Sequence, residues 1–339
     1  MKLLSLSQAT LSTKLLNFSI FAQLNLMSMD FLIANEVEKK YGSFVALDKL
    51  NLNVPQNSIF GLLGPNGAGK TTFIRIVNQI TAPDSGGILI DGKKLSQIHI
   101  NEIGYLPEER GLYKKMKVGE QALYLSRLKG LSRNDAYKQL KYWFEKFEIA
   151  AWWDKKVEEL SKGMQQKIQF IITVLHKPKL LIFDEPFSGF DPINTNQLKQ
   201  EILKLRYEGA TILFSTHNMS SVEEICDYIA LINHSKKVLD GNINEIRNRY
   251  ASGIYEFTYK GYFHKLAATL TPSYEILETS EVDGISNIKI RLLDKNISEN
   301  ELIQRMLGYG AVQSFSLVKP SMNDIFIRVV GESQKSESI

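Results

Sequence analysis

The chain has 339 residues, of which 44% are hydrophobic, 23% charged and 10% aromatic. These values are typical of folded globular protein and exclude a disordered, collagen-like or membrane-spanning chain. The 41 basic and 37 acidic residues give a net charge of only +4, which does not indicate a nucleic-acid partner. The single cysteine, Cys226, excludes an internal disulfide framework and favours a reducing compartment.

The first 28 residues differ from the rest because Leu, Ser, Asn and Gln dominate and only Lys2 and Lys14 are charged. Two leucines follow Lys2, as at the start of a signal peptide, but polar residues interrupt any apolar core. The apolar run at 15–27 is shorter than the ~20 residues that a membrane span needs. We therefore expect translation to start at Met29, with residues 1–28 untranslated or disordered.

A glycine-rich loop lies between a strand predicted at 58–63 and a helix predicted at 71–80. The loop reads Gly64, Pro65, Asn66, Gly67, Ala68, Gly69, Lys70, Thr71, Thr72. Its glycines let backbone N–H groups turn inward and bind an anion, which the positive end of the helix also attracts. In such a loop Lys70 reaches the β- and γ-phosphates of a nucleotide and the Thr71 hydroxyl ligates Mg²⁺. The order of strand, loop and helix favours this phosphate site over a simple tight turn.

Two carboxylates follow a second buried strand, predicted at 180–183. Asp184 and Glu185 would lie at the carboxyl edge of an open α/β sheet, where ligands bind. There Asp184 would hold Mg²⁺ and Glu185 would act as general base toward the attacking water. Another strand, at 210–214, leads to His217, a candidate sensor of the γ-phosphate. The alternatives of helix-capping carboxylates and a packed or surface histidine stay open on these residues alone.

Together these motifs resemble the nucleotide-binding subunit of an ABC transporter. Residues 160–167, which include Ser161 and Gly163, are similar to the family's signature, and residues 188–191, ending in Asp191, to its D-loop. In the family the signature closes on ATP held by the other subunit, so the resemblance implies a dimer, most simply a twofold homodimer. It also implies that Tyr41 stacks on adenine, although a strand tyrosine is commonly a core residue. The histidine that the family uses as γ-phosphate sensor matches His217.

Three positions depart from the family pattern. Glu108 stands where glutamine is usual, in a loop that contacts Mg²⁺ and the transmembrane subunit, and a carboxylate is the stronger metal ligand. Lys162 and Met164 replace glycine and glutamine within the signature. Because Ser161 and Gly163 are retained, we expect ATP hydrolysis to survive these changes.

The resemblance runs over about residues 35–246 and predicts a cassette at 29–250. This is an α/β P-loop NTPase fold with a mixed sheet core and a helical subdomain at about 112–159, which grips the transmembrane subunit in the family. Residues 251–331 read as β, α, β, β, α, β, a small α+β domain of the ferredoxin-like type. Export-type ATPases of the sodium and drug kind carry such an accessory domain. The polar segment 332–339 is expected to be a disordered tail.

The resemblance implies a subunit that binds ATP and Mg²⁺ and hydrolyses ATP to export a solute through a separate integral-membrane permease. It would lie at the cytoplasmic face of the cell membrane, held there by the permease, with no nucleic-acid partner. One alternative is a mechanical ATPase of the same superfamily that acts on DNA or ribosomes. Such proteins usually carry long coiled coils or two cassettes, but the sequence has neither heptad runs nor a second glycine-rich phosphate loop. The other is a non-catalytic ATP sensor, which is disfavoured by the intact set of Lys70, Asp184, Glu185 and His217.

Overall fold

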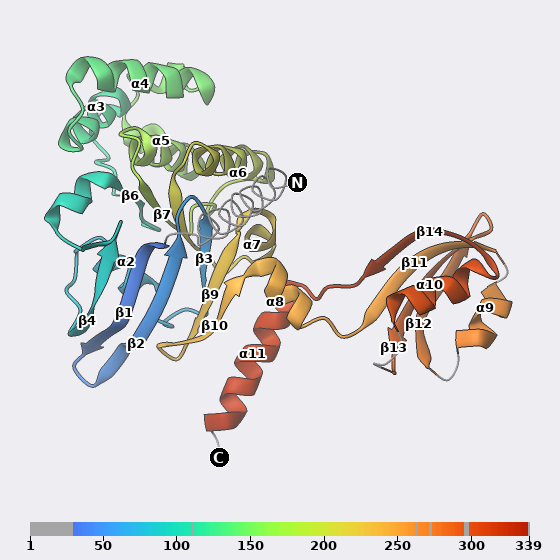
Figure 1. Ribbon diagram of the computed structural model, residues 1–339. Coiled ribbons are helices and arrows are strands. Elements are labelled where there is room, and N and C mark those ends of the chain that lie inside the picture. The colour runs from blue at the N-terminus through green and yellow to red at the C-terminus, as the bar shows by residue number, and fades with distance from the viewer. Residues whose placement is uncertain (1–29, 110, 262, 271–272, 295–297, 338–339) are drawn as a thin grey trace, which may run out of the picture. The chain divides into compact units, whose positions relative to one another are not determined.

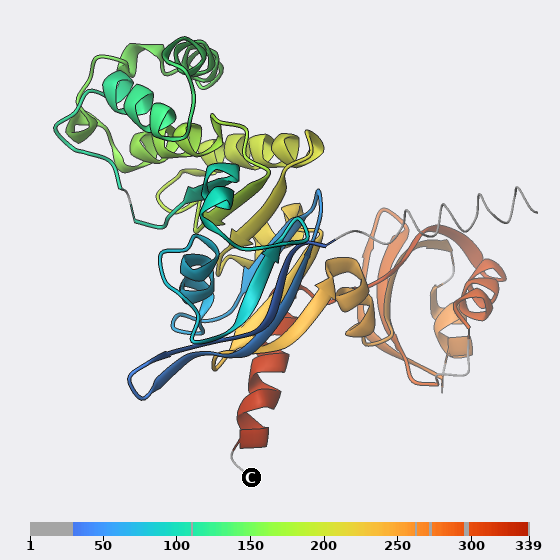
Figure 2. The ribbon, with the colours of Figure 1, turned by 60° about the vertical axis from the view of Figure 1, so that its left-hand side comes forward.

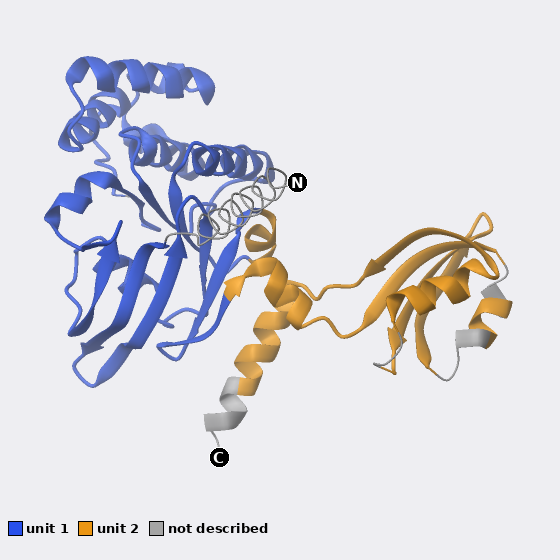
Figure 3. Cartoon of the chain, in the orientation of Figure 1, with its two compact units in different colours: residues 1–218, 225–240 blue, residues 219–224, 241–339 orange. Residues whose placement is uncertain are grey.

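The structure is a computed structural model that describes residues 30–337, apart from residues 110, 262, 271–272 and 295–297 (Figures 1 and 2). The head segment 1–28 lies outside the described residues. The described chain forms two compact units: one reaches to Asn218 and includes Ile225–Asp240, and the other consists of Met219–Glu224 and the chain from Gly241 (Figure 3). No helix of the described residues is long and apolar enough to cross a membrane.

A six-stranded sheet with the order β10-β9-β3-β8-β7-β6 forms the centre of the first unit. Its strands are β3 (Ile59–Leu63), β6 (Ile103–Leu106), β7 (Leu180–Asp184), β8 (Thr211–Ser215), β9 (Tyr228–Asn233) and β10 (Lys236–Asn242). The pairs from β9 to β6 are parallel. Every residue of β3, β7 and β8 is buried, in keeping with the runs of apolar residues that make up most of each strand. Parallel pairing brings the carboxyl ends of these neighbours to the same edge.

The second sheet of this unit is antiparallel, with the order β2-β1-β4-β5. It contains β1 (Asp30–Tyr41), β2 (Phe44–Pro55), β4 (Ser85–Ile90) and β5 (Lys93–Lys94), and a short 3-10 helix, η1 (Gln97–Glu102), follows. α2 (Lys70–Val77) buries its apolar residues in a core shared by the two sheets. That core includes Leu32, Leu50, Leu62, Phe73, Ile182 and Leu213. The mixed-sheet P-loop fold expected from the sequence is confirmed.

The chain between β6 and β7 is mainly helical. α3 (Val118–Leu128) and α4 (Arg133–Lys146) lie together at one end of the unit, next to α5 (Lys162–Val174) (Figures 1 and 2). Two 3-10 helices, η2 (Ala150–Trp152) and η3 (Val157–Glu159), connect α4 to α5. Trp143, Phe144 and Phe147 are buried there, so these aromatic side chains serve as core. After β7 come α6 (Pro192–Tyr207) and, beyond β8, α7 (Met219–Ile225).

The second unit contains an antiparallel sheet with the order β12-β13-β11-β14. In chain order its elements are β11 (Ile254–Gly261), α9 (Phe263–Leu270), β12 (Tyr274–Val282), β13 (Ile285–Leu292), α10 (Glu299–Leu307) and β14 (Gly310–Leu317). This order and this pairing are those of a ferredoxin-like fold, as expected. Alternate residues Tyr255, Phe257 and Tyr259 of β11 are buried in its core with Leu302 and Met306 of α10.

Two further helices flank this sheet in the chain, α8 (Ile243–Arg249) before it and α11 (Met322–Glu337) after it. α11 extends through most of the segment from residue 332 that was expected to be a disordered tail. Its polar composition suggested disorder, but the helix has a buried side, with Ile325 and Val329 four residues apart, and an i,i+4 ion pair between Arg328 and Glu332 at 3.1 Å.

Replacing the central aromatic residue of the ferredoxin-like core should destabilise the second unit. Phe257 is fully buried, so Phe257→Ala is expected to cost about 3–5 kcal/mol of unfolding free energy. Hydrogen-exchange mass spectrometry should show faster exchange in β11–β14, with β3 and β7 unchanged. Lys260→Ala, an exposed position on the same strand, is the control, and equal effects of the two changes would contradict this core assignment.

Candidate functional site

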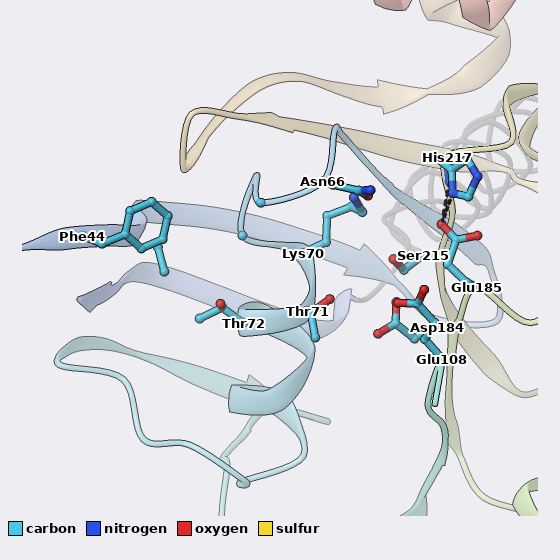
Figure 4. A pocket seen from close by; sticks show the side chains of 13 residues that line it. Phe44, Asn66, Lys70, Thr71, Thr72, Glu108, Asp184, Glu185, Ser215 and His217 are labelled. Carbon is cyan, nitrogen blue, oxygen red and sulfur yellow. Dashed lines mark hydrogen bonds and ion pairs between the residues drawn. The ribbon is translucent and has the colours of Figure 1, made fainter. Parts of the chain in front are cut away.

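Four neighbouring strands carry the candidate site at their carboxyl ends (Figure 4). β3 leads into the glycine-rich loop, β6 toward Glu108, β7 ends at Asp184, and β8 ends at Ser215. A cavity of about 360 Å³ opens at this edge. It is lined by Phe44, Ala46, Asn66, Gly67, Gly69, Lys70, Thr71, Thr72, Glu108, Asp184, Glu185, Ser215 and His217.

The loop between β3 and α2 depends on two of its glycines for close backbone packing. Gly64 has φ +146° and Gly69 has φ +113°, values at which L side chains are strained. A Cβ atom on Gly64 would lie 2.2 Å from the Ile232 carbonyl oxygen, and one on Gly69 would lie 2.3 Å from the Ala46 carbonyl oxygen. Gly67 also has a positive φ, +80°, but a Cβ there would meet nothing within 4 Å. The loop is therefore seated on β2 and β9 through Gly64 and Gly69.

Lys70, the first residue of α2, folds back over the loop that precedes it. Its Nζ donates to the carbonyl oxygens of Gly64 at 2.7 Å and Pro65 at 3.0 Å. Burial lowers the pKa of Lys70, and the three carboxylates of the site act in the opposite direction. The lysine side chain therefore holds its charged end at the loop, where phosphate oxygens can replace carbonyl oxygens as acceptors.

Three carboxylates, from Glu108, Asp184 and Glu185, converge opposite this one lysine. Burial raises the pKa of Asp184, and Glu108 and Glu185 add to the rise, while the Ser215 hydroxyl and Lys70 oppose it. The described residues contain no cluster of three His, Cys, Asp or Glu side chains that could hold a metal by itself. The hard oxygen donors present suit Mg²⁺, which in nucleotide sites binds one or two protein groups plus phosphate oxygens and waters.

The Glu185 carboxylate is held at both oxygens by the loop after β8. Nδ1 of His217 lies 2.6 Å from Glu185 Oε1, and the His217 backbone N–H donates to the same oxygen at 2.9 Å (Figure 4). The Thr216 hydroxyl donates to Oε2 at 3.0 Å, and the Glu185 N–H donates to the Ser215 carbonyl at 2.9 Å. The orientation of the carboxylate therefore depends on where the 216–217 segment lies.

The signature and D-loop residues lie together in a different cavity, also about 360 Å³. Ser161 caps α5 by accepting from the Met164 N–H at 3.3 Å, and Asp191 caps α6 by accepting from the Asn194 N–H at 2.9 Å. A Cβ on Gly163 would lie 3.3 Å from the Gly189 carbonyl oxygen, so the signature packs directly on the D-loop. The cavity is lined by Trp152, Ser161, Lys162, Gly163, Met164, Lys167, Gly189, Asp191 and Asn194.

Most of the expected phosphate-site residues line the first cavity, but some do not. Tyr41, Gly64, Pro65 and Ala68 are not among its lining residues. The lining aromatic residue is Phe44, which pairs with Tyr41 across the β1–β2 hairpin. Sequence reasoning missed Phe44 and Ala46 because the hairpin register decides which side chain faces the cavity. It also missed Ser215, which its position at a strand end beside the motif could have indicated.

Comparison with known proteins identifies the same regions. Residues 47–188 match the ABC transporter family, and residues 241–330 match the C-terminal domain of DrrA1-3-like ATP-binding proteins. The chain is 42% identical to the uncharacterized ABC transporter ATP-binding protein YhaQ of Bacillus subtilis, over 88% of this chain and 98% of that protein. It is 31% identical to the bacitracin transport ATP-binding protein BcrA of Enterococcus faecalis, over 90% and 98%.

Among solved structures, the ATP-binding subunit of an ABC transporter matches with a TM-score of 0.61 and 28% identity, over 65% of this chain and 93% of that one. Fold and site thus define a P-loop ATPase of the ATP-binding-cassette type. The chain belongs to the ATP-binding subunits of ABC transporters, a family that binds ATP and hydrolyses it to drive transport.

Adding a methyl group to the loop should weaken nucleotide binding only where the backbone is crowded. Gly69→Ala is expected to lower ATP affinity at least tenfold, a loss of about 1.4 kcal/mol, because its Cβ collides with the Ala46 carbonyl. Gly67→Ala is the matched control, since it also has a positive φ but has open space around it. Titration with a fluorescent ATP analogue measures both. Equal losses would show that the strained φ, and not the close packing, decides affinity.

Proposed function

We propose that this chain powers the export of a solute through a separate membrane permease, working at the cytoplasmic face of the membrane. The observation that carries the catalytic part is Glu185, held at both oxygens beside the phosphate loop. The export part is supported by relatives that match nearly the full chain and are named for bacitracin transport and for Nod factor export. The match of residues 241–330 to the C-terminal domain of DrrA1-3-like ATP-binding proteins fits the accessory domain that the sequence predicts for an export-type ATPase.

In this proposal the loop N–H groups and Lys70 bind the β- and γ-phosphates, while Glu185 accepts the proton of the attacking water. His217 fixes Glu185 through its 2.6 Å contact and lies where it can also approach the terminal phosphate. Tyr41 and Phe44 form an exposed aromatic pair at the end of the β1–β2 hairpin, and we assign base stacking to this pair.

Thr71, Asp184 and Glu108 would hold Mg²⁺ together with phosphate oxygens and water. When bound, the ion would offset the negative charge of the phosphate oxygens. Two strand ends position the carboxylates, because Asp184 is the last residue of β7 and Glu108 follows the end of β6. Three carboxylates against one lysine leave a negative excess that a divalent cation would offset.

We infer a homodimer in which the signature cavity of one copy closes over the phosphate cavity of the other. Each copy has one cavity of each kind, so two copies complete two sites. The permease contact is assigned to the helical subdomain because large apolar and aromatic side chains remain exposed there. These are Tyr113, Tyr124, Leu128, Tyr137 and Tyr142, between 48% and 62% exposed. The near-neutral charge supports a partner other than nucleic acid.

Removing the proton acceptor should separate binding from hydrolysis. Glu185→Gln keeps the side-chain shape, so we expect turnover to fall by ~10²-fold or more while ATP affinity stays within about twofold. With hydrolysis blocked, ATP should hold two copies together, and size-exclusion chromatography with light scattering should show a dimer. Glu208→Gln, the same change at the exposed end of α6, is the control. Hydrolysis by Glu185→Gln at the original rate would refute the assigned mechanism, and a lasting monomer would refute the homodimer.

Changing the carboxylates should lower the affinity for the metal ion more than it lowers the affinity for the nucleotide. Loss of even an outer-shell partner typically costs ~10-fold in metal affinity, so we expect Asp184→Asn to cost at least that. Both changes leave an amide oxygen, but Glu108 is exposed to solvent whereas Asp184 is buried, so Glu108→Gln should cost less. Electron paramagnetic resonance of Mn²⁺ in the presence of ATP gives the metal affinity without relying on turnover. Unchanged Mn²⁺ affinity in both variants would show that neither carboxylate is a ligand.

A further inference from the structure

The helix that follows His217 belongs by its contacts to the C-terminal half of the protein. α7 begins at Met219, two residues after His217, in the connection between β8 and β9 of the central sheet. Its residues Met219–Glu224 nevertheless group with the second unit (Figure 3). Within α7, Val222 is fully buried and Ser221 is 2% exposed. The segment that fixes Glu185 therefore continues directly into a helix that the C-terminal unit holds.

One carboxylate, that of Glu223, joins α7 to two other helices of this unit. Its Oε1 accepts a hydrogen bond from the Met322 N–H at the start of α11, at 2.5 Å. Its Oε2 lies 3.4 Å from Nη1 of Arg247 on α8. The same guanidinium donates through Nε to the Pro320 carbonyl at 3.0 Å, just before α11. The Glu223 and Arg247 side chains are only 23% and 25% exposed, so solvent screens this pair less than a surface pair.

The start of α11 is fixed by a cap and by a buried apolar side. Ser321 and Asp324 form a reciprocal cap, in which the Ser321 hydroxyl accepts from the Asp324 N–H at 3.1 Å and Asp324 accepts from the Ser321 N–H at 3.2 Å. On one side of the helix Met322, Ile325 and Val329 are at most 6% exposed. The first turn of α11 is thus buried and capped where it donates to Glu223.

Both connections of the ferredoxin-like sheet lead to these helices. Four residues separate the end of α8 at Arg249 from the start of β11 at Ile254. Four residues likewise separate the end of β14 at Leu317 from the start of α11 at Met322. The Val318 N–H donates to the Ile254 carbonyl at 2.8 Å, so the two connections start side by side. Any displacement of α8 against α11 therefore acts on the Glu223 contacts.

We propose that the C-terminal unit positions His217 for catalysis through α7, with Glu223 as the positioning residue. This inference rests on the proposed role of His217. When the Glu223 contacts are lost, α7 loses its hydrogen bond to α11 and its ion pair with α8. A resulting shift of α7 would also move the 216–217 segment that orients Glu185. Hydrolysis then slows while ATP affinity is kept, because the phosphate loop lies between β3 and α2, with Lys70 in α2, and none of these is part of α7.

The test compares Glu223→Ala with Glu223→Gln in the full-length chain. Glu223→Ala should lower kcat at least about tenfold with KM for ATP within about twofold, since a misplacement of ~1 Å can cost ~10²-fold. Glu223→Gln, which keeps an acceptor for the Met322 N–H, should restore part of the rate. Glu245→Ala, a change of an exposed glutamate on α8, is the control and should leave both constants unchanged.

A second readout follows His217 directly. The chain has five histidines, and ¹⁵N imidazole signals can be assigned to His217 by their loss in His217→Gln. We expect Glu223→Ala to shift the His217 signals and to leave those of the buried His99 unchanged. If Glu223→Ala fails to fold, Arg247→Lys gives the same comparison, because it keeps the charge but not the reach to Glu223 and Pro320. Arg249→Lys is then the control.

The outcomes separate this inference from the function on which it rests. Normal kcat and unshifted His217 signals in Glu223→Ala, with hydrolysis lost in His217→Gln, would overturn the positioning role and leave the role of His217 intact. A lower kcat without a shift of the His217 signals would also overturn it. Hydrolysis by His217→Gln at the original rate would instead refute the proposed function of the histidine.

Discussion

Parallel pairing of β3, β8, β7 and β6 is the constraint on which the site depends. Each strand contributes a different chemical group just past its carboxyl end: the phosphate loop, Ser215 with the following Thr216 and His217, Asp184 with Glu185, and Glu108. These groups come from positions far apart in the sequence. Because parallel strands place all carboxyl ends on one edge, the pairing alone brings them together.

Negative charge is concentrated at this edge, where three carboxylates face one lysine. Burying Asp184 close to the carboxylates of Glu108 and Glu185 is unfavourable, and burial together with their repulsion raises the pKa of Asp184. The fold tolerates this because its apolar strands and shared core supply the stability. An unbalanced set of charges in an otherwise well-packed unit is typical of a functional site. Binding of a nucleotide with its cation should therefore also stabilise the folded chain.

Sequence patterns predicted the central strands, the phosphate loop and the ferredoxin-like order well, because each depends on local spacing. The run of apolar residues before Asp184 and the glycines around Lys70 are examples. Other features depend on long-range geometry and could not be predicted. Whether Tyr41 or Phe44 lines the cavity depends on hairpin register. The contacts of Glu223 on α7 depend on the fold as well, because they join residues 24 and 99 positions apart in the chain. Polar composition also hid the helical periodicity of α11.

The ferredoxin-like sheet resembles a domain inserted into the chain, because its start and its end lie next to each other. Its first strand begins at Ile254 and the chain leaves it at Val318, and these two residues are hydrogen-bonded to each other. A domain whose ends adjoin can be exchanged for another with little change to the chain around it. The helices that precede and follow the sheet, α8 and α11, would be retained in such an exchange. The sheet is therefore a part of the chain that can change in sequence and size while the ATP-binding cassette stays the same.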